Sequence, residues 1–197
     1  GLNLCVETLD GLVKHNGPIN DTKNIDNILG KNIFKNKIKF KKKPSLESQV
    51  ASISDDIAYN SHDLEDGIKA NLFRIEDLHG IPVLSDIIYK HKKKLKADNK
   101  VLVLHQIVRD MINEMVKDIV INTKKNLRDQ GIHNRNDVYK AKYPLVCFSE
   151  KMYEFDISIK EFLTEKMYYN QSVLNKAKKG MLIISKLFEL INKKPKK

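Results

Sequence analysis

The stretch PSLESQVASISDDIAYNSHDLEDGIKANLF, residues 44–73, decides which fold the sequence predicts. Ser45 follows a proline and is a residue type that caps helix N-termini, and Glu47 stands in the next turn, where the helix dipole favours a carboxylate. Apolar residues then recur at helical spacing, at Leu46, Val50, Ile53 and Ile57. We therefore expect a long helix that begins at residue 45 and continues to about residue 70.

The same spacing of apolar residues predicts further helices along the chain. They are expected at residues 2–15, 83–95, 99–127, 150–169 and 175–191. The run Asn16-Gly17-Pro18 ends the first of them, because its first two residues tolerate a left-handed backbone and proline cannot continue a helix. Asn99 is the expected N-cap of the longest helix. No alternating strand pattern of useful length is present, so the sequence predicts an all-α fold.

Two polar stretches separate these helices. Residues 17–44 are rich in Asn and Lys and end in KFKKKP, which predicts a long surface loop with a short helical turn at residues 25–29. Residues 129–149 are expected to form a second loop. No other linker divides the chain, so we expect one all-α region over residues 1–197 that ends in a disordered basic tail at residues 193–197.

Composition and charge narrow the class of protein. With 197 residues and 41% hydrophobic content the chain is long enough to bury a core. No apolar run of about 18 residues occurs, so the sequence predicts no membrane span. The net charge of +11 favours polyanionic partners such as nucleotides or single-stranded nucleic acid. Only four residues are Arg, however, and Arg is the side chain that most often reads bases in duplex DNA.

The two cysteines and the start of the chain bear on the compartment. Cys5 and Cys147 lie within the apolar tripeptides LCV and VCF, so we expect buried, reduced thiols in a cytoplasmic protein rather than a disulfide. No Cys/His spacing typical of a zinc site is present. The first residues lack the basic and apolar regions of a signal peptide, and an amphipathic start at Gly1 is what we expect of a segment cut from a longer protein.

An acidic row within residues 54–67 is the candidate site. Asp55, Tyr59 and Asp63 follow one another at intervals of four residues, which places them on one face of a helix. Asp55 and Asp63 would lie about 12 Å apart along the axis at 1.5 Å per residue. That is too far to share one metal ion, but it suits an extended ligand such as a nucleoside triphosphate. The alternative is a solvated acidic face that pairs with nearby lysines.

Four motifs carry a resemblance to a known family. Residues 44–73 resemble the signature P-S-L-E-A-Q-V…D-D-I-A-Y…H-D-x-x-D-G of the bacterial deoxyguanosinetriphosphate triphosphohydrolase-like proteins, which belong to the HD-domain superfamily. LNLCVETLDGLVKHNGP (residues 2–18) resembles the segment before it. YPLVCFSEKMYEF (143–155) and KEFLTEKMYYNQSV (160–173) resemble the closing region. The resemblance covers nearly the whole chain in the same order and implies the C-terminal part of a helical HD-domain-type bundle.

The resemblance implies a reaction and roles for particular residues. The family hydrolyses a deoxynucleoside triphosphate, especially dGTP, to the deoxynucleoside and triphosphate, at a divalent metal (Mg²⁺ or Mn²⁺) held by a His, a His-Asp pair and a distant Asp. A metal-polarised water attacks the α-phosphorus. The distant Asp falls on Asp55, with Asp56 as the alternative metal ligand. Tyr59 matches a substrate-contacting Tyr, and Asp63 matches an Asp that holds the sugar 3′-hydroxyl.

Three further residues are weaker candidates for substrate binding. Lys14 and His15 match a family segment near the nucleotide pocket, but they also fit a plain helix C-terminus, where the dipole favours cations. Arg109 on the longest expected helix is a candidate for contact with phosphate or else an ordinary surface residue.

The chain departs from the family pattern in one respect. It has no His-Asp pair other than His62-Asp63, so three of the four metal ligands are absent. We expect them in a missing N-terminal half, either upstream or in a separate chain, and we expect this chain alone to be incomplete and inactive. The alternative function is a catalytically inactive remnant that acts as a nucleotide-binding or interaction module. A homo-oligomer is expected, because apolar faces on the helices at 2–13 and 101–127 would otherwise be exposed.

Overall fold

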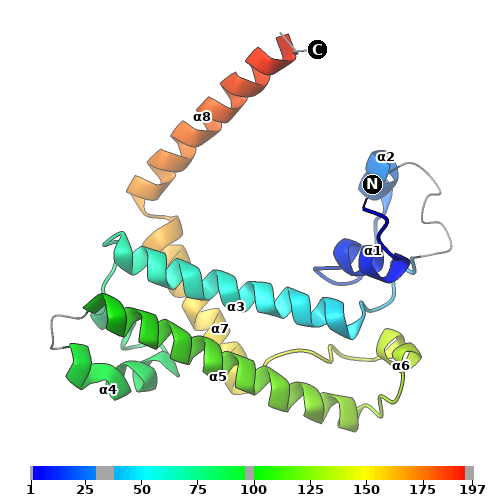
Figure 1. Cartoon of the computed structure of the whole chain (residues 1–197), viewed down its shortest axis with the longest axis horizontal. Coiled ribbons are helices and arrows are strands. Elements are labelled where there is room, and N and C mark those ends of the chain that lie inside the picture. Colours follow the sequence, from blue (N-terminus) through cyan, green and yellow to red (C-terminus); the bar gives the residue numbers. More distant parts are fainter. Residues whose placement is uncertain (1, 30–37, 96–99, 194–197) are drawn as a thin grey trace. The chain divides into compact units, whose positions relative to one another are not determined.

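The computed structural model describes residues 2–29, 38–95 and 100–193. Within these ranges the regular elements are all helical (Figure 1), and no β-strand occurs, which confirms the all-α prediction. No helix in these ranges has the length and apolar composition that crossing a membrane would require. In chain order the elements are α1 (Val6–Val13), α2 (Lys23–Leu29), α3 (Leu46–Lys69), η1 (Ile75–Leu78), α4 (Leu84–Leu95), α5 (Lys100–Asp129), α6 (Arg135–Lys140), α7 (Glu150–Leu163), η2 (Thr164–Tyr168) and α8 (Gln171–Lys193).

Most expected helices are present, with different ends. Helix α3 begins as predicted, because the hydroxyl of Ser45 accepts a hydrogen bond from the Ser48 amide at 3.2 Å. The expected helix at residues 150–169 leaves α-helical geometry at Leu163 and continues as one π-helical turn, η2. The proposed cap Asn99, the middle of the predicted loop (residues 30–37) and the tail (residues 194–197) lie outside the described residues.

Two predictions from sequence were wrong. The expected loop at residues 129–149 contains the helix α6, which is capped at its start by the Asn134 side chain. Cys5 was expected to be buried but is exposed, as are residues 2–4 before it. Cys147 is half-buried, and both thiols are free.

The chain divides into two compact units. The first unit comprises residues 1–59 and 110–153, and the second unit comprises residues 60–109 and 154–197. Helices α3, α5 and α7 each contribute residues to both units. The single region over residues 1–197 that the sequence favours stays a prediction.

In the first unit, amide side chains hold an extended segment, residues 143–149, against the helices. Asn126 Nδ2 donates to the Leu145 carbonyl at 3.1 Å, and Asn122 Nδ2 donates to the Cys147 carbonyl at 2.9 Å. Gln49 Oε1 on α3 accepts from the Leu145 amide at 3.1 Å. These bonds satisfy backbone groups that a non-helical segment would otherwise leave unpaired. The segment is therefore held against α3 and α5.

The second unit packs around a pair of aromatic rings and a buried polar pair. The Phe73 and Phe162 rings meet edge to face with centroids 4.9 Å apart, a favourable aromatic geometry. Asn60 Nδ2 donates to the buried Asp156 Oδ1 at 2.8 Å, and Lys160 pairs with Oδ2 of the same carboxylate at 2.8 Å. Asp156 thus has a donor for each oxygen, as a buried carboxylate requires.

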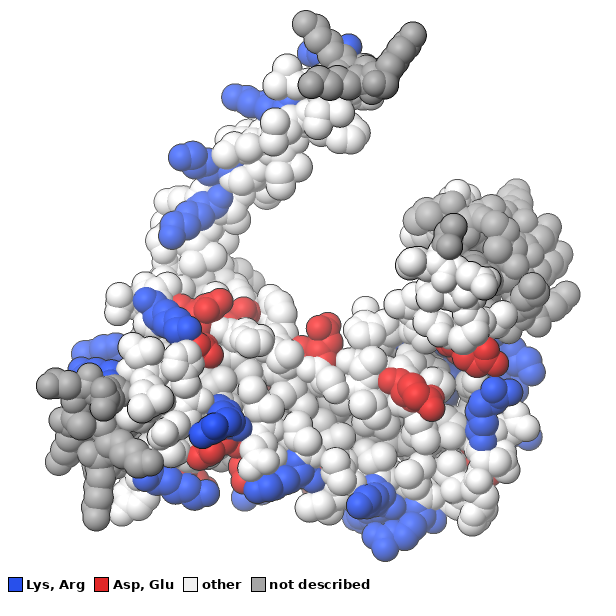
Figure 2. Space-filling model, viewed as in Figure 1, with Lys and Arg blue, Asp and Glu red and all other residues white. Residues whose placement is uncertain are grey.

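Among the described residues of helix α8 (Gln171–Lys193), none is buried. Large apolar side chains remain exposed along it, including Met181, Ile184, Leu187, Phe188 and Ile191. Figure 2 shows lysines along one edge of this helix and an uncharged surface beside them. The helix is therefore amphipathic, with its apolar face in contact with solvent.

Candidate functional site

The turn that follows α1 directs two successive basic side chains into different surroundings. The Gly17 amide donates to the Lys14 carbonyl at 2.8 Å, and Gly17 has φ of 103°, a left-handed conformation that favours glycine. Lys14 is buried, with 1% of its surface exposed, and pairs with Asp10 at 2.7 Å. His15 lines a separate pocket that Lys14 does not reach. Of these two substrate candidates, only His15 therefore borders the candidate site.

A pocket of about 360 Å³ lies beside His15, within the first unit. The turn after α1, the start of α3 and the extended segment at residues 143–149 form its walls. We call it the His15 pocket, and its polar lining includes His15, Lys43, Gln49, Ser52 and Asp56. This volume lies within the range of small-molecule sites, which is roughly 300–1,000 Å³.

The two candidate metal ligands, Asp55 and Asp56, are exposed near this pocket. Asp56 lines the pocket itself, whereas Asp55 Oδ2 lies 3.7 Å from His15 Nε2. The Asp55 side chain is 76% exposed and that of His15 is 40% exposed. A side-chain contact this open to solvent contributes little to stability. Both groups are thus accessible to a ligand.

The other two members of the acidic row have different surroundings. Tyr59 is exposed one turn after Asp55, and Ile57 between them is buried, as the helical spacing predicts. Asp63 lies in the second unit, where its Oδ2 accepts a hydrogen bond from the hydroxyl of Tyr168. An ionised carboxylate accepts several hydrogen bonds, so this contact leaves acceptor capacity on Asp63.

Tyr168 is a residue that sequence reasoning did not connect with the acidic row. It is the last residue of the π-helical turn η2 and lies 105 positions after Asp63. The motif at residues 160–173 contains it, but no spacing rule relates that motif to α3. Only the packing of α3 with the α7–η2 segment within the second unit shows the contact.

Glu65, also within the acidic stretch, pairs with basic neighbours. Lys69 donates to its carboxylate, and His105 Nδ1 lies 3.0 Å from Oε1. The hydrogen bond from Lys69 holds the pKa of Glu65 below its usual value, because it favours the ionised form. For this residue the alternative of an acidic face paired with cations is correct.

Arg109, the remaining substrate candidate, is exposed on α5 in the second unit. Among the described residues it forms no ion pair. Its contact with phosphate stays a prediction.

Mg²⁺ requires about six oxygen ligands, several of them from water or phosphate. Asp55, Asp56 and His15 offer suitable donor atoms. Within the part of the chain that the structure describes, however, no group of three or more His, Cys, Asp or Glu side chains is arranged to hold a metal ion. These residues alone therefore do not form a complete metal site.

Comparison with known proteins gives relatives along the whole chain. It is 48% identical over 197 residues to a deoxyguanosinetriphosphate triphosphohydrolase-like protein of Pelagibacter ubique, covering 100% of this chain and 53% of the relative. A protein of the same name in Parvibaculum lavamentivorans is 34% identical over 99% of this chain and 50% of the relative. A third, in Rickettsia typhi, is 34% identical over 96% of this chain and 49% of the relative.

A family model for the phosphohydrolase-associated domain matches residues 146–197, which include α7 and α8. The chain spans about half the length of the curated relatives it matches. These matches are consistent with a C-terminal portion of such proteins.

Proposed function

We propose that this chain, which is homologous over its whole length to part of the deoxyguanosinetriphosphate triphosphohydrolase-like proteins, contributes one wall of a site that hydrolyses deoxynucleoside triphosphates. The names of the relatives support the class of reaction. The observation that carries the assignment to a site is the exposed face of α3. There Asp55 and Tyr59 follow one another at one-turn spacing, and His15 lies against Asp55.

Asp55 is the proposed metal ligand. Its carboxylate is accessible, and its neighbour His15 makes only an open contact with it, so a cation can displace that contact at little cost. A divalent ion, Mg²⁺ or Mn²⁺, would supply Lewis-acid chemistry at a phosphate group. The remaining ligands of this ion are proposed to come from residues other than the described ones, because the described residues do not form a complete set of metal ligands. Asp56 remains the alternative ligand, since it lines the His15 pocket.

Substrate contacts are proposed for Tyr59, Asp63 and His15. Helix α3 is continuous from Leu46 to Lys69, so Tyr59 and Asp63 follow Asp55 at intervals of one helical turn. Tyr59 is exposed, so its ring can pack against the sugar or its hydroxyl can donate a hydrogen bond to the substrate. Asp63, oriented by Tyr168, can accept a hydrogen bond from a sugar hydroxyl. The substrate class is a deoxynucleoside triphosphate, with dGTP as the first to test.

A second candidate function is a nucleotide-binding or interaction module without turnover. The lack of a metal-binding group among the described residues favours it for the chain on its own. The exposed apolar face of α8 favours an interaction role in addition, because such faces commonly mark protein interfaces. On this basis the expected homo-oligomer is part of the proposal. The net charge of +11 favours single-stranded nucleic acid as a further ligand class for such a module.

Release of triphosphate from dGTP, with Mn²⁺ or Mg²⁺ present, tests the proposed function. It is measured on the chain itself, on a full-length protein that contains it, and on that protein with Asp55→Ala or Tyr59→Phe. We expect turnover only in the longer protein, its loss with Asp55→Ala, and a raised KM with Tyr59→Phe. Full activity of the Asp55→Ala protein would refute the metal assignment. Binding of dGTP by a longer protein that shows no turnover would instead support the second candidate.

A further inference from the structure

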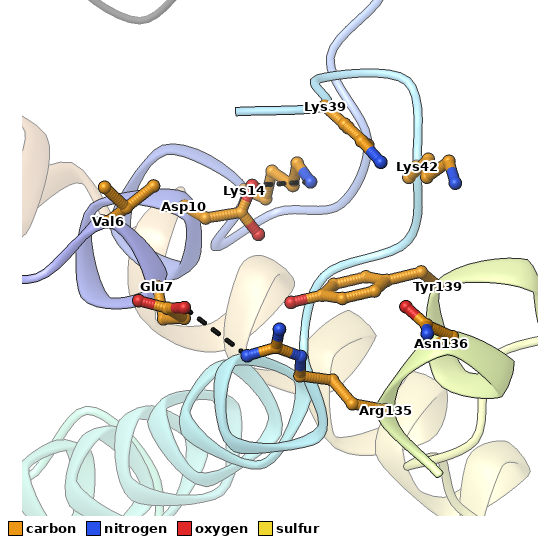
Figure 3. A pocket seen from close by; sticks show the side chains of 9 residues that line it. All are labelled: Val6, Glu7, Asp10, Lys14, Lys39, Lys42, Arg135, Asn136 and Tyr139. Atoms are coloured by element: carbon orange, nitrogen blue, oxygen red, sulfur yellow. Dashed lines mark hydrogen bonds and ion pairs between the residues drawn. The ribbon is translucent and has the colours of Figure 1, made fainter. Parts of the chain in front are cut away.

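A second pocket in the first unit is lined by residues other than those of the His15 pocket, and Lys14 is the one earlier substrate candidate among them. Three segments contribute to it: α1, the segment before α3, and α6 (Figure 3). We call it the basic pocket and define it by Asp10, Lys14, Lys39, Lys42, Arg135 and Tyr139. Its volume is about 210 Å³, and it does not include His15, Asp55 or Asp56. It is therefore separate from the His15 pocket.

Cations outnumber carboxylates in the lining of the basic pocket. Arg135 Nη1 lies 3.4 Å from Glu7 Oε1, and Lys14 pairs with Asp10, so two of the four cations have a carboxylate partner. The other two are Lys39 and Lys42, which form no ion pair with any described residue. A pocket with two unneutralised ammonium groups attracts an anion, and lysine is a common phosphate ligand.

The pocket also offers a buried acceptor. Asp10 is 7% exposed, and its Oδ2 has no hydrogen-bond partner among the described residues. Its other oxygen, Oδ1, contacts Lys14. Figure 3 shows the Asp10 carboxylate directed toward the space between α1 and Tyr139. Because buried carboxylate oxygens are nearly always hydrogen-bonded, Oδ2 is suited to accept from a hydroxyl or N–H that enters the pocket.

Tyr139 adds a neutral hydroxyl. Burial, and then the charge of Asp10, raise the pKa of Tyr139 above its usual value, so the phenol keeps its proton. Lys14 Nζ lies 5.9 Å from the centre of the Tyr139 ring, which keeps the ring beside the Lys14–Asp10 pair. In Figure 3 the hydroxyl points into the pocket. The lining thus combines several donors suited to phosphate with one acceptor suited to a hydroxyl.

We propose that the basic pocket binds a sugar phosphate, either free or as the sugar-phosphate part of a nucleotide. Lys39 and Lys42 bind the phosphate, Tyr139 donates a hydrogen bond to it, and Asp10 Oδ2 accepts from a sugar hydroxyl. The volume of about 210 Å³ is below the usual range for drug-sized ligands, which suits one phosphate and one sugar rather than a whole nucleoside triphosphate. The ligand joins α1 to α6 and does not depend on the acidic row of α3.

Isothermal titration calorimetry of the chain with ribose 5-phosphate, dGMP and inorganic phosphate tests the proposal. The Lys39→Ala/Lys42→Ala protein should bind ribose 5-phosphate at least roughly tenfold more weakly than the wild type, which corresponds to about 1.4 kcal/mol. Lys41→Ala is the matched control, since Lys41 lies in the same segment but does not line the pocket. It should change the affinity less than about twofold.

The contribution of the acceptor is measured by comparing ligands. Wild type should bind ribose 5-phosphate more tightly than inorganic phosphate by roughly threefold or more, and Asp10→Asn should reduce this preference, because it weakens the acceptor. Tighter binding of dGMP than of ribose 5-phosphate would show that the pocket takes the sugar phosphate of a nucleotide. Tighter binding of ribose 5-phosphate than of dGMP would show that it takes the free sugar phosphate. Circular dichroism confirms that each variant is folded.

Two outcomes would overturn the proposal. One is the absence of saturable binding of any phosphorylated ligand to the wild-type chain. The other is an equal loss of affinity in Lys41→Ala and in the double variant, which would show non-specific attraction to a basic surface. No residue of the acidic row lines the basic pocket, so the affinity for ribose 5-phosphate does not depend on the metal assignment, and failure here is distinguishable from failure of the proposed hydrolase function.

Discussion

Replacement of Gly67 by alanine tests the packing of the second unit. Gly67 is buried within α3, and a Cβ built on it would lie well inside van der Waals contact of the Phe73 ring atoms Cε1 and Cζ. Phe73 is itself buried and meets the Phe162 ring edge to face, so it has little freedom to move away. We therefore expect Gly67→Ala to force a rearrangement of this aromatic pair.

The magnitude follows from two opposing effects. Alanine in a helix interior is favoured over glycine by about 1 kcal/mol, whereas overpacking a core costs about 1–3 kcal/mol. Gly180→Ala on α8 is the control, because a Cβ there would meet nothing within 4 Å. It carries only the favourable effect. The two variants should thus differ by about 2 kcal/mol, or roughly 4–8 °C in melting temperature for a chain of this size.

Thermal unfolding followed by circular dichroism provides the comparison. We expect Gly180→Ala to unfold at a higher temperature than Gly67→Ala. In the double variant, Phe73→Leu should reduce the loss of stability caused by Gly67→Ala, because leucine lacks the ring atoms that collide with the new Cβ. Equal stabilisation by Gly67→Ala and Gly180→Ala would refute the close approach of Phe73 to α3.

Two further changes address the polar groups of the second unit. In a denaturant titration, Asn60→Ala should lower the free energy of unfolding by about 1–3 kcal/mol, because it leaves a buried oxygen of Asp156 without its donor. Asn113 is exposed, so Asn113→Ala should have almost no effect on the free energy of unfolding. Glu65→Gln tests the ion pair with Lys69. Folding lowers the pKa of Glu65, so the ionised carboxylate stabilises the fold above about pH 4.5. This contribution is lost as the pH falls through the folded-state pKa. The difference in melting temperature between wild type and Glu65→Gln should therefore shrink on acidification, and a constant difference would contradict the pairing.

Local signals in the sequence suffice for α3. The cap at Ser45 and the apolar spacing predict where it begins, and Ile57 and Leu64 are buried as that spacing requires. Such signals act between residues a few positions apart, so they survive in the folded chain whatever its tertiary contacts. The exposure of Asp55 and Tyr59 follows from the same periodicity.

Helix α6 was missed because it has only six residues, too few to show an apolar period. Its signal was a capping box, in which Asn134 accepts from the Asp137 amide at 3.3 Å and Asp137 Oδ2 accepts from the Asn134 amide at 3.1 Å. The missed helix matters, because it supplies Arg135 and Tyr139 to the basic pocket.

Contacts between distant parts of the chain were beyond sequence reasoning. The burial of Lys14 depends on its pairing with Asp10 and on Tyr139 of α6, and the neighbour of Asp63 is a tyrosine on η2. Each contact is decided by how helices pack, which residue spacing within one helix does not encode. For that reason Lys14 and His15, adjacent in sequence, lie in different pockets.

The affinity of a full-length protein containing this chain for Mn²⁺ tests the central claim most directly. Electron paramagnetic resonance counts free Mn²⁺ without turnover, and Asp129→Ala is the control, because Asp129 is exposed and lies outside the His15 pocket. We predict that Asp55→Ala weakens Mn²⁺ binding by at least roughly 100-fold, since even residues that only support a metal ligand are worth about 10- to 100-fold. Asp56→Ala and Asp129→Ala should change it by less than about threefold. Unchanged affinity in Asp55→Ala, or a large loss in Asp56→Ala alone, would contradict the assignment of Asp55 as the metal ligand.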